Sequence, residues 1–534
     1  MWILTGGGKT QWTVFRHNGP MFPEEYKPHN IPILINNQKV NLKPDVEEKI
    51  TAYAKYIGTD YLNNSKFNKN FFKEIKNDFP NYTLEDFINF DFSLIKTHLE
   101  KEREIRLSKT KEQKDKIKEK QKELDKPYSS LQIDGAEQKV GNFKIEPPGI
   151  FLGRGSHPKI GMWKKRILPK DVTLNLDKEA PIPKPHLYPN EKWGKIVHQR
   201  EAIWLATWKD EITGKNKYVF PSVESSFKSE SDKDKFDLAR NLKKKINTIR
   251  NKFMEDIKSN DLTTRQLATA LYFIDELALR VGGKKDTKEQ ADTVGVTSLR
   301  VEHIILQDNN TIRLDFLGKD SIRFCKVIKV HEDVYNNLKQ FIENKEKKID
   351  LFDKINSNTL NNYLKSFMKD LSAKVWRTFK ASSTFQKEIS KIKEEDVKDF
   401  NENEKINYLL SKFNYANTQV ALLCNHQKGV SKNFDDQIDK IKNRIKELKK
   451  KKTKAKSKEK QLSYKNKILL EKSKLETKTK MKNVSLGTSK TNYIDPRIIM
   501  AFGKKFDLPL DKLFTKALLS RFEWATHVDK DYTF

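Results

Sequence analysis

The chain has 534 residues, enough for two to four structural units with a core each. Lysine and arginine outnumber aspartate and glutamate by 105 to 73, and the formal net charge of +32 favours a polyanionic partner such as nucleic acid. No apolar run approaches the ~18 residues of a membrane-spanning helix, and the first residues show no signal-peptide core. We therefore expect an intracellular protein that is neither secreted nor embedded in a membrane.

Metal and disulfide chemistry have no visible site. Cys325 and Cys424 lie far apart and outside any Cys/His spacing typical of zinc, and the carboxylates are mostly interleaved with lysine. The start, Gly6-Gly7-Gly8-Lys9-Thr10, is similar to the end of a phosphate-binding loop, but Ile3 stands where that pattern requires glycine. We expect neither a metal ion nor a cofactor.

Turn signals and charge divide the first half of the chain. Residues 1–98 are predicted to mix helices and strands, and residues 142–226 to be strand-like and rich in turns. Between them, residues 99–126 are nearly all charged and indicate one long exposed helix or a pair of helices. That segment is either a solvated strut, which we favour, or a direct binding element. A boundary is predicted near Pro221.

Periodicity predicts a mainly helical second half. Residues 236–280 and 360–425 are helical by pattern, and residues 299–327 read as two or three antiparallel strands. Within the latter region, residues 315–322 indicate the tip of a hairpin that carries Lys319.

A lysine-rich segment, residues 432–482, contains two apolar stripes around a basic stretch without core residues. Such stripes favour an antiparallel helical hairpin held by its seam, whereas the alternative is a disordered basic linker. The stripes consist of Ile438, Ile441, Ile445 and Leu448, and of Leu462, Leu469, Ile468 and Leu475.

Cleavage of a phosphodiester without a metal requires an attacking oxygen, donors to the non-bridging oxygens and an acid for the leaving oxygen. Tyr493 is a candidate nucleophile, because Asp495 and Pro496 signal a helix start just after it, a position that allows the hydroxyl to face outward. Spacing alone, however, favours a half-buried structural tyrosine.

Four further residues have both a structural and a chemical interpretation. As structural residues, Arg280 can interact favourably with the C-terminal end of a helix dipole, and Arg377 can form an ion pair. Lys319 can be a solvent-exposed turn residue, and His426 can cap a helix. Each can also serve a phosphate, since arginine matches phosphate oxygens with its planar fork.

Seven motifs in order carry a resemblance that decides between these interpretations. The chain resembles the eukaryotic type IB DNA topoisomerases along nearly its whole length. The matching strings are WTVFRHNGPMF, NFKIEPPGIFLGRGSHPKIGM, LYFIDELALR, DTVGVTSLRVEHI, DFLGKDSIR, ALLCNHQ and LGTSKTNYIDPRI, with the ending FEWATHVDKDYTF.

The resemblance implies an α+β multidomain fold that clamps DNA between two lobes. It divides the chain into a mixed N-terminal cap (1–220), a mostly helical catalytic domain of the tyrosine-recombinase type (221–430), an antiparallel coiled-coil linker (431–481) and a C-terminal domain with the nucleophile (482–534).

The same resemblance assigns catalytic roles. Tyr493 is implied to form a 3′-phosphotyrosyl bond, Arg280, Arg377 and His426 to bind non-bridging phosphate oxygens, and Lys319 to protonate the leaving 5′-oxygen.

Four other residues match family positions that touch DNA near the cut. They are Arg154, Asp320, Thr488 and Asn492, and the last also marks where camptothecin-type inhibitors contact the family. Two positions depart from the pattern: Leu152 replaces a common arginine and Gly283 a common asparagine, which bears on drug response and local DNA contacts.

The implied function is relaxation of positive and negative supercoils through transient single-strand cleavage, strand rotation and religation, without ATP or metal. The partner is duplex DNA, bound by a monomer, in the nucleus or, for a viral member, in a virion or cytoplasmic viral factory. The alternatives are a tyrosine recombinase or integrase, which usually carries His-x-x-Arg where this chain has Lys374-Val375-Trp376-Arg377, and a non-catalytic basic DNA-binding protein.

Overall fold

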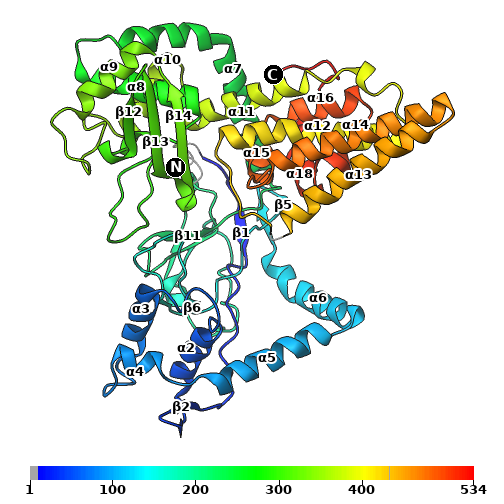
Figure 1. Cartoon of the computed structure of the whole chain (residues 1–534). Coiled ribbons are helices and arrows are strands. Elements are labelled where there is room, and N and C mark those ends of the chain that lie inside the picture. The colour runs from blue at the N-terminus through cyan, green and yellow to red at the C-terminus, as the bar shows by residue number, and fades with distance from the viewer. Residues whose placement is uncertain (1–9, 432) are drawn as a thin grey trace. The chain divides into compact units, whose positions relative to one another are not determined.

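A computed structural model describes residues 10–431 and 433–534, so the glycine-rich start at residues 6–8 lies outside the described part (Figure 1). About half of the described residues are helical and the fold is mixed α+β. The chain forms two compact units. Unit 1 runs to Ser226 and includes Lys285–Asp292, and unit 2 comprises Phe227–Lys284 and Thr293–Phe534.

Small sheets dominate unit 1. All of their strand pairs are antiparallel except β8 with β9. The sheets are β1 (Phe15–His17), β4 (Ser130–Ile133) and β5 (Ala136–Lys139); β11 (Asn216–Val219), β10 (Ala206–Lys209), β8 (Thr173–Asn175) and β9 (Lys195–Val197); β2 (Ile33–Ile35) with β3 (Gln38–Val40); and β6 (Gly149–Ile150) with β7 (Trp163–Lys164).

Three helices of unit 1 enclose an aromatic core. They are α2 (Pro44–Ala54), α3 (Ser65–Ile75) and α4 (Leu84–Ile88). Tyr53 and Phe71 stack with ring centroids 4.6 Å apart, and Phe67 and Phe87 are fully buried beside them. Burial of this aromatic surface holds the short helices together.

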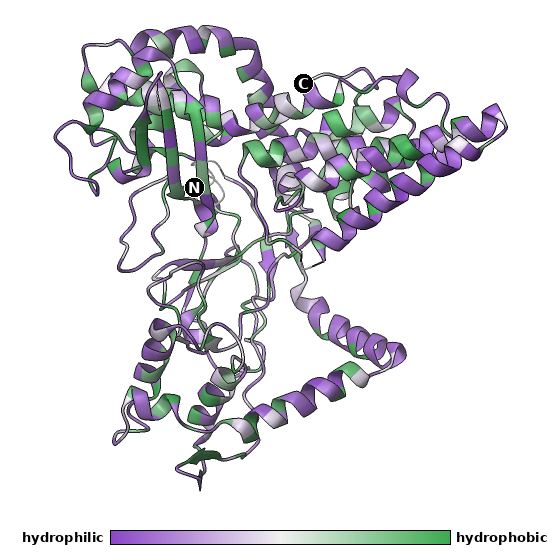
Figure 2. Cartoon of the chain, viewed as in Figure 1, coloured by the Kyte–Doolittle hydropathy of each residue, from purple (hydrophilic) through white to green (hydrophobic). Residues whose placement is uncertain are grey.

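The charged segment predicted at residues 99–126 forms two helices, α5 (Ser93–Ser108) and α6 (Lys111–Asp125), followed by the 3₁₀ turn η2 (Lys126–Tyr128). A capping box separates them: the Thr110 hydroxyl accepts from Gln113 N at 3.2 Å, and the Gln113 side chain accepts from Thr110 N at 3.0 Å. Both helices are hydrophilic almost throughout (Figure 2), and only Ile95 of the two is buried.

Unit 2 surrounds one large hydrophobic core that includes Trp376, Phe273, Phe352 and Phe385. Its principal helices are α7 (Ser226–Asp256), α8 (Leu262–Leu277), α9 (Glu332–Ile342), α10 (Ser357–Phe367), α11 (Ala373–Ile389), α12 (Glu402–Leu423), α15 (Gly487–Asn492), α16 (Pro496–Lys505), α17 (Leu510–Leu513) and α18 (Lys516–Arg521). The short 3₁₀ turns of the chain are η3 (Pro169–Asp171), η4 (Val296–Ser298), η5 (Val301–His303), η6 (Lys319–Ser321), η7 (Glu394–Asp396) and η8 (Glu523–Ala525).

One antiparallel sheet crosses unit 2 in the order β12 (Ile304–Gln307), β13 (Thr311–Leu317) and β14 (Arg323–Lys329). It confirms the strands predicted within residues 299–327. The β13–β14 pair ends at Leu317 and Arg323, so Lys319 stands at the hairpin tip as predicted.

The segment predicted to be helical, residues 236–280, contains two helices, α7 and α8. Asp261 starts a new helix, α8, by accepting a hydrogen bond from Thr264 N at 2.7 Å. Polar turn residues at positions 259–261 compete with the helical backbone and break the run. Helix α8 ends at Leu277 because Ala278 adopts a left-handed conformation, with φ of 50°.

The lysine-rich segment forms α13 (Phe434–Lys454) and α14 (Lys458–Lys480), which lie side by side (Figure 1). Ile445 and Leu448 of α13 pack against Ile468 of α14. The predicted contribution of Leu462 and Leu469 to this seam is wrong, because these side chains are 41% and 42% exposed.

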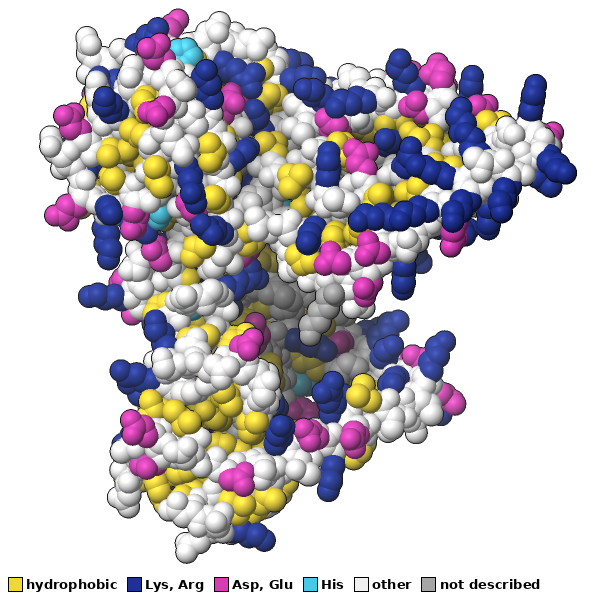
Figure 3. All heavy atoms as spheres, viewed as in Figure 1, with side chains coloured by type: hydrophobic (Ala, Val, Ile, Leu, Met, Phe, Trp, Pro, Cys, Tyr) yellow, Lys and Arg dark blue, Asp and Glu magenta, His cyan; other side chains and the backbone are white. Residues whose placement is uncertain are grey.

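Polar contacts join α14 to α12 within unit 2, since Ser473 lies 3.0 Å from Ser411 of α12 and both hydroxyls are buried. Lysine and arginine side chains gather over the outer surface of α13 and α14 (Figure 3). Among the described residues, no helix is both long and apolar enough to cross a membrane.

Candidate active site

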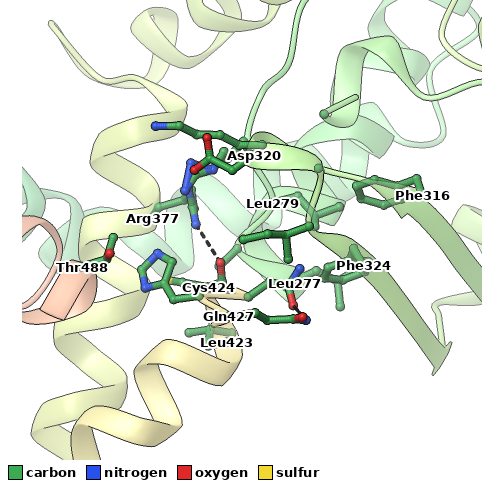
Figure 4. Close-up of a pocket in the computed structure, with 18 of the residues that line it drawn as sticks. Leu277, Leu279, Phe316, Asp320, Phe324, Arg377, Leu423, Cys424, Gln427 and Thr488 are labelled. Carbon is green, nitrogen blue, oxygen red and sulfur yellow. Dashed lines mark hydrogen bonds between the residues drawn. The ribbon is translucent and has the colours of Figure 1, made fainter. Parts of the chain in front are cut away.

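A cavity of about 230 Å³ in unit 2 collects residues from six parts of the chain (Figure 4). Its walls come from the end of α8, the segment just before η4, the β13–β14 turn, α11, the segment after α12, and α15 with the residues before it. Six of the predicted site residues line it: Arg280, Lys319, Asp320, Arg377, His426 and Thr488.

Arg377 projects from α11 into this cavity. Its neighbour Trp376 is fully buried and donates to Asp275 at 3.1 Å, which fixes α11 against α8. Arg377 itself is 3% exposed; its Nη1 donates to the Tyr493 hydroxyl at 3.2 Å and its Nη2 to Cys424 O at 3.3 Å. The structural ion pair considered for Arg377 does not occur among the described residues, and its buried Nε has no partner there.

The Tyr493 hydroxyl does not face outward, although its place before a helix start allows it. Tyr493 is 8% exposed, and its hydroxyl points to Arg377. Ser382 of α11 donates to Tyr493 O and accepts from Asp495 N, both at 3.0 Å. Asp495 caps α16 as predicted, by accepting from Arg497 N at 3.0 Å. The helix start is thus correct, but the tyrosine is held from two sides by α11.

Arg280 lies three residues beyond the end of α8, so it does not serve the last turn of that helix. Its carbonyl accepts from Val296 N at 2.9 Å, which pairs its loop with the start of η4. The approach requires glycine, because a Cβ on Gly295 would stand 2.5 Å from Gly282 Cα. Burial and the charge of Arg377 lower the pKa of the Arg280 guanidinium below its usual value.

His426 follows α12, after Asn425 turns the chain with φ of 54°. Its Nδ1 lies 2.8 Å from the buried Ser489 hydroxyl, whereas its buried Nε2 has no hydrogen-bond partner among the described residues. Burial and the charges of Arg377, Arg280 and Lys319 lower the pKa of His426 to about 3. The imidazole is therefore neutral near pH 7.

Lys319 and Asp320 are exposed at the tip of the β13–β14 hairpin. The backbone there is left-handed at Asp320 and Ser321, with φ of 65° and 58°. The turn presents the lysine at the cavity mouth, where side chains can meet a ligand without crossing the protein core.

Of the remaining predicted residues, only Thr488 lines the cavity. Thr488 is exposed on α15 and lines it, whereas Asn492 does not and donates to Thr488 O at 3.2 Å. Arg154 is exposed and lies between two glycines with positive φ. It belongs to unit 1, whereas the residues that line the cavity belong to unit 2. Leu152 packs against the aromatic core of unit 1.

Three supporting residues escaped sequence reasoning. Ser382 holds the nucleophile segment, Ser489 contacts His426, and Lys235 donates to Asn492 O at 3.1 Å. Their residue types do not indicate these supporting contacts, because serine and lysine are usually exposed. Ser489 stands four residues before Tyr493 on a short helix, which is the one local signal of its position.

The cavity concentrates positive charge. Arg280, Arg377 and Lys319 line it together with the neutral His426, and Asp320 is the only carboxylate among the residues that line the cavity. Arg377 also donates to the Tyr493 hydroxyl. No group of three or more potential metal ligands occurs within residues 10–431 and 433–534. The cationic hydrogen-bond donors around the cavity suit an anion that carries several oxygen acceptors, such as a phosphodiester.

Family profiles match almost the whole chain. Residues 10–221 match the DNA-binding fragment of eukaryotic DNA topoisomerase I, residues 224–459 its catalytic core, and residues 465–534 the C-terminal topoisomerase domain. The chain belongs to the eukaryotic DNA topoisomerase I family. Within it, Arg280, Lys319, Arg377 and His426 fall in the topoisomerase catalytic core and Tyr493 in the C-terminal domain.

Curated topoisomerases cover the same extent. DNA topoisomerase 1 of Caenorhabditis elegans is 42% identical, with 98% of this chain and 68% of that protein covered. DNA topoisomerase 1 beta of Arabidopsis thaliana is 39% identical, with 100% and 60% covered, and human DNA topoisomerase 1 is 38% identical, with 98% and 72% covered.

Proposed function

We infer that this chain is a DNA topoisomerase that relaxes positive and negative supercoils by transient cleavage of one strand, rotation and religation. One observation carries the assignment beyond family membership. The hydroxyl of Tyr493 receives a hydrogen bond from Arg377 beside a cavity that also holds Arg280, Lys319 and His426.

Tyr493 is the proposed nucleophile. Its oxygen attacks the scissile phosphorus and forms a 3′-phosphotyrosyl bond, while the bond from phosphorus to the 5′-oxygen breaks. The phenol proton passes to solvent water, and the donor from Arg377 stabilises the negative charge that develops on the phenol oxygen. The covalent link conserves the energy of the phosphodiester, so religation needs neither ATP nor a metal ion.

The donors of the cavity are proposed to bind the non-bridging oxygens. Arg280 and Arg377 supply charge-assisted hydrogen bonds, and His426 supplies a neutral N–H donor from Nε2, which has no partner among the described residues. Preorganised donors of this kind stabilise the transition state because they need no reorientation when charge develops.

Lys319 is the proposed general acid, which transfers a proton to the departing 5′-oxygen and takes it back during religation. The exposed hairpin tip lets the lysine enter a DNA groove. Arg154, Asp320, Thr488 and Asn492 are proposed to contact DNA near the cut, and Asn492 to border a site for camptothecin-type inhibitors at the nick.

We propose that residues 1–220 form a cap and residues 221–430 a catalytic domain, which together clamp the duplex. Residues 431–481 act as a coiled-coil linker, and residues 482–534 carry the nucleophile. The protein acts as a monomer in the nucleus. Affinity rests on phosphate contacts and falls steeply with salt, with weak sequence preference.

The test is relaxation of negatively and of positively supercoiled plasmid by the purified protein, in EDTA and without ATP. We expect relaxation of both, together with a protein–DNA adduct on the 3′ end of the broken strand. Tyr493→Phe should bind DNA with wild-type affinity but form no adduct. Relaxation by Tyr493→Phe, or DNA binding without any change of linking number by the wild-type protein, would contradict the assignment.

A further inference from the structure

Ser489 is a buried side chain that contacts the candidate site from behind. It is fully buried on α15, and its hydroxyl lies 2.8 Å from His426 Nδ1. We propose that Ser489 is a positioning residue that holds His426 in the tautomer with hydrogen on Nε2, ready to donate to the scissile phosphate. The proposal rests on the function inferred above.

The geometry limits what the Ser489 hydroxyl can do. Within residues 10–431 and 433–534 its only hydrogen-bond partner is His426 Nδ1. If Nδ1 carried the hydrogen and donated to Ser489, the serine hydrogen would be buried without an acceptor, which costs about 1–3 kcal/mol. If Ser489 donates to Nδ1, both groups are satisfied and the ring hydrogen sits on Nε2.

The tautomer matters because His426 is neutral. A neutral imidazole has one N–H donor and one acceptor nitrogen, and the partner of one nitrogen decides which is which. The lowered pKa of about 3 keeps the free protein in this neutral form over the physiological range. With hydrogen on Nδ1, the lone pair of Nε2 would instead face the phosphate oxygen and repel it.

Ser489 also connects the histidine to the nucleophile. Its carbonyl accepts from Tyr493 N at 2.9 Å and from Ile494 N at 3.1 Å, while its hydroxyl reaches His426. The two chain segments are joined again where Ser485 N donates to His426 O at 2.9 Å. One residue of α15 thereby sets the backbone of Tyr493 and the donor direction of His426.

The first experiment is single-turnover cleavage of a nicked duplex substrate by full-length variants. Ser489→Ala should reduce the cleavage rate by about 10- to 100-fold, the range found when the hydrogen-bond partner that orients a metal-binding histidine is removed. Ser489→Thr keeps the hydroxyl and should recover most of the rate. Ser383→Ala is the matched control, because the Ser383 hydroxyl has no partner among the described residues.

A second variant separates positioning from general damage. His426→Gln offers an amide N–H that has no tautomer, so adding Ser489→Ala to His426→Gln should cost no further rate. An equal loss in both backgrounds would overturn the proposal, as would a wild-type rate for Ser489→Ala.

The tautomer can be observed directly by ¹⁵N NMR of histidine-labelled protein, with His426→Gln to assign the signal. We expect a protonated Nε2 and an unprotonated Nδ1 in the wild type. The reverse pattern would refute the proposal even if Ser489→Ala failed to fold. The NMR measurement does not depend on catalysis. A wild-type protein that fails to cleave DNA would contradict the inferred function, but the tautomer of His426 could still be measured.

Discussion

The guanidinium of Arg377 meets Tyr493 at two points: Nη1 donates a 3.2 Å hydrogen bond to the phenol oxygen, and the guanidinium carbon lies 4.8 Å from the ring centroid. The contact joins α11 to the segment between α15 and α16. It aligns the proposed nucleophile and leaves the buried Nε of Arg377 without a partner among the described residues.

Arg377→Lys should lower the single-turnover cleavage rate by about 10²- to 10³-fold, the usual cost of losing one preorganised donor to a transition-state oxyanion. Lysine keeps the charge but cannot reach Tyr493, Cys424 and a phosphate together, because it lacks the planar fork. Arg444→Lys on α13, where the arginine is exposed and pairs with Glu447 at 3.3 Å, is the control for composition. Equal rates for Arg377→Lys and the wild type would remove Arg377 from the mechanism.

Ser382→Ala should slow cleavage and lower the thermal midpoint of unit 2. The variant leaves Tyr493 O and Asp495 N without their partner in a buried position, which costs about 1–3 kcal/mol. Ser383→Ala should change neither quantity, because the Ser383 hydroxyl makes no hydrogen bond within the described residues. Calorimetry and cleavage assays on Ser382→Ala and Ser383→Ala test this prediction. Equal thermal midpoints and equal cleavage rates for the two variants would contradict it.

Local signals in the sequence predicted the parts of the site that depend on local structure. Asp495 and Pro496 start a helix, and the turn around Lys319 joins two strands, as their residue types indicate. Family motifs selected Arg280 and His426, which line the same cavity. These predictions needed no knowledge of tertiary packing.

The inward hydroxyl of Tyr493 was not predictable in that way. It depends on Arg377, which lies 116 residues earlier in the chain. The same holds for the α13–α14 seam: both Leu469 and Ile468 fit a spacing of seven, and only packing against α13 decides that Ile468 is buried. A periodic pattern indicates a face but not its partner.

Gly295→Ala should disrupt the loop that carries Arg280. The added Cβ would lie 2.5 Å from Gly282 Cα and 2.7 Å from Arg280 O, so the backbone has to shift. Overpacking of this kind costs about 1–3 kcal/mol, and the displaced arginine should reduce cleavage as well. In the matched control Gly283→Ala, the Cβ meets nothing within 4 Å, so the thermal midpoint should stay unchanged. An unchanged midpoint for Gly295→Ala would show that the loop yields freely.

His426 should make the folded state sensitive to acid. Burial and neighbouring cations lower its pKa from 6.5 to about 3, so the unfolded chain binds this proton at a higher pH than the folded chain does. The contribution of neutral His426 to the free energy of unfolding is therefore fully present above pH 6.5 and declines as the pH falls towards 3. Thermal midpoints of the wild type and His426→Gln, measured from about pH 7 to about pH 4, should shift in favour of the variant as the solution becomes more acidic. His527→Gln, at an exposed position, should follow the wild type, and parallel curves for all three proteins would rule out His426 as the source of the acid sensitivity.

Ile468→Ala should loosen the α13–α14 pair, whereas Leu469→Ala should not. Ile468 is 9% exposed and packs with Ile445 and Leu448, while Leu469 is 42% exposed. Truncating the buried isoleucine costs about 2 kcal/mol. If trypsin cuts the lysine-rich helices from a locally opened state, that cost raises the cutting rate within residues 433–480 by about 30-fold. Leu469→Ala removes the same number of carbon atoms from a solvated face, so its digestion should match the wild type. Equal protection of the two variants would mean that the helices are held by their contacts with α12 rather than by their own seam.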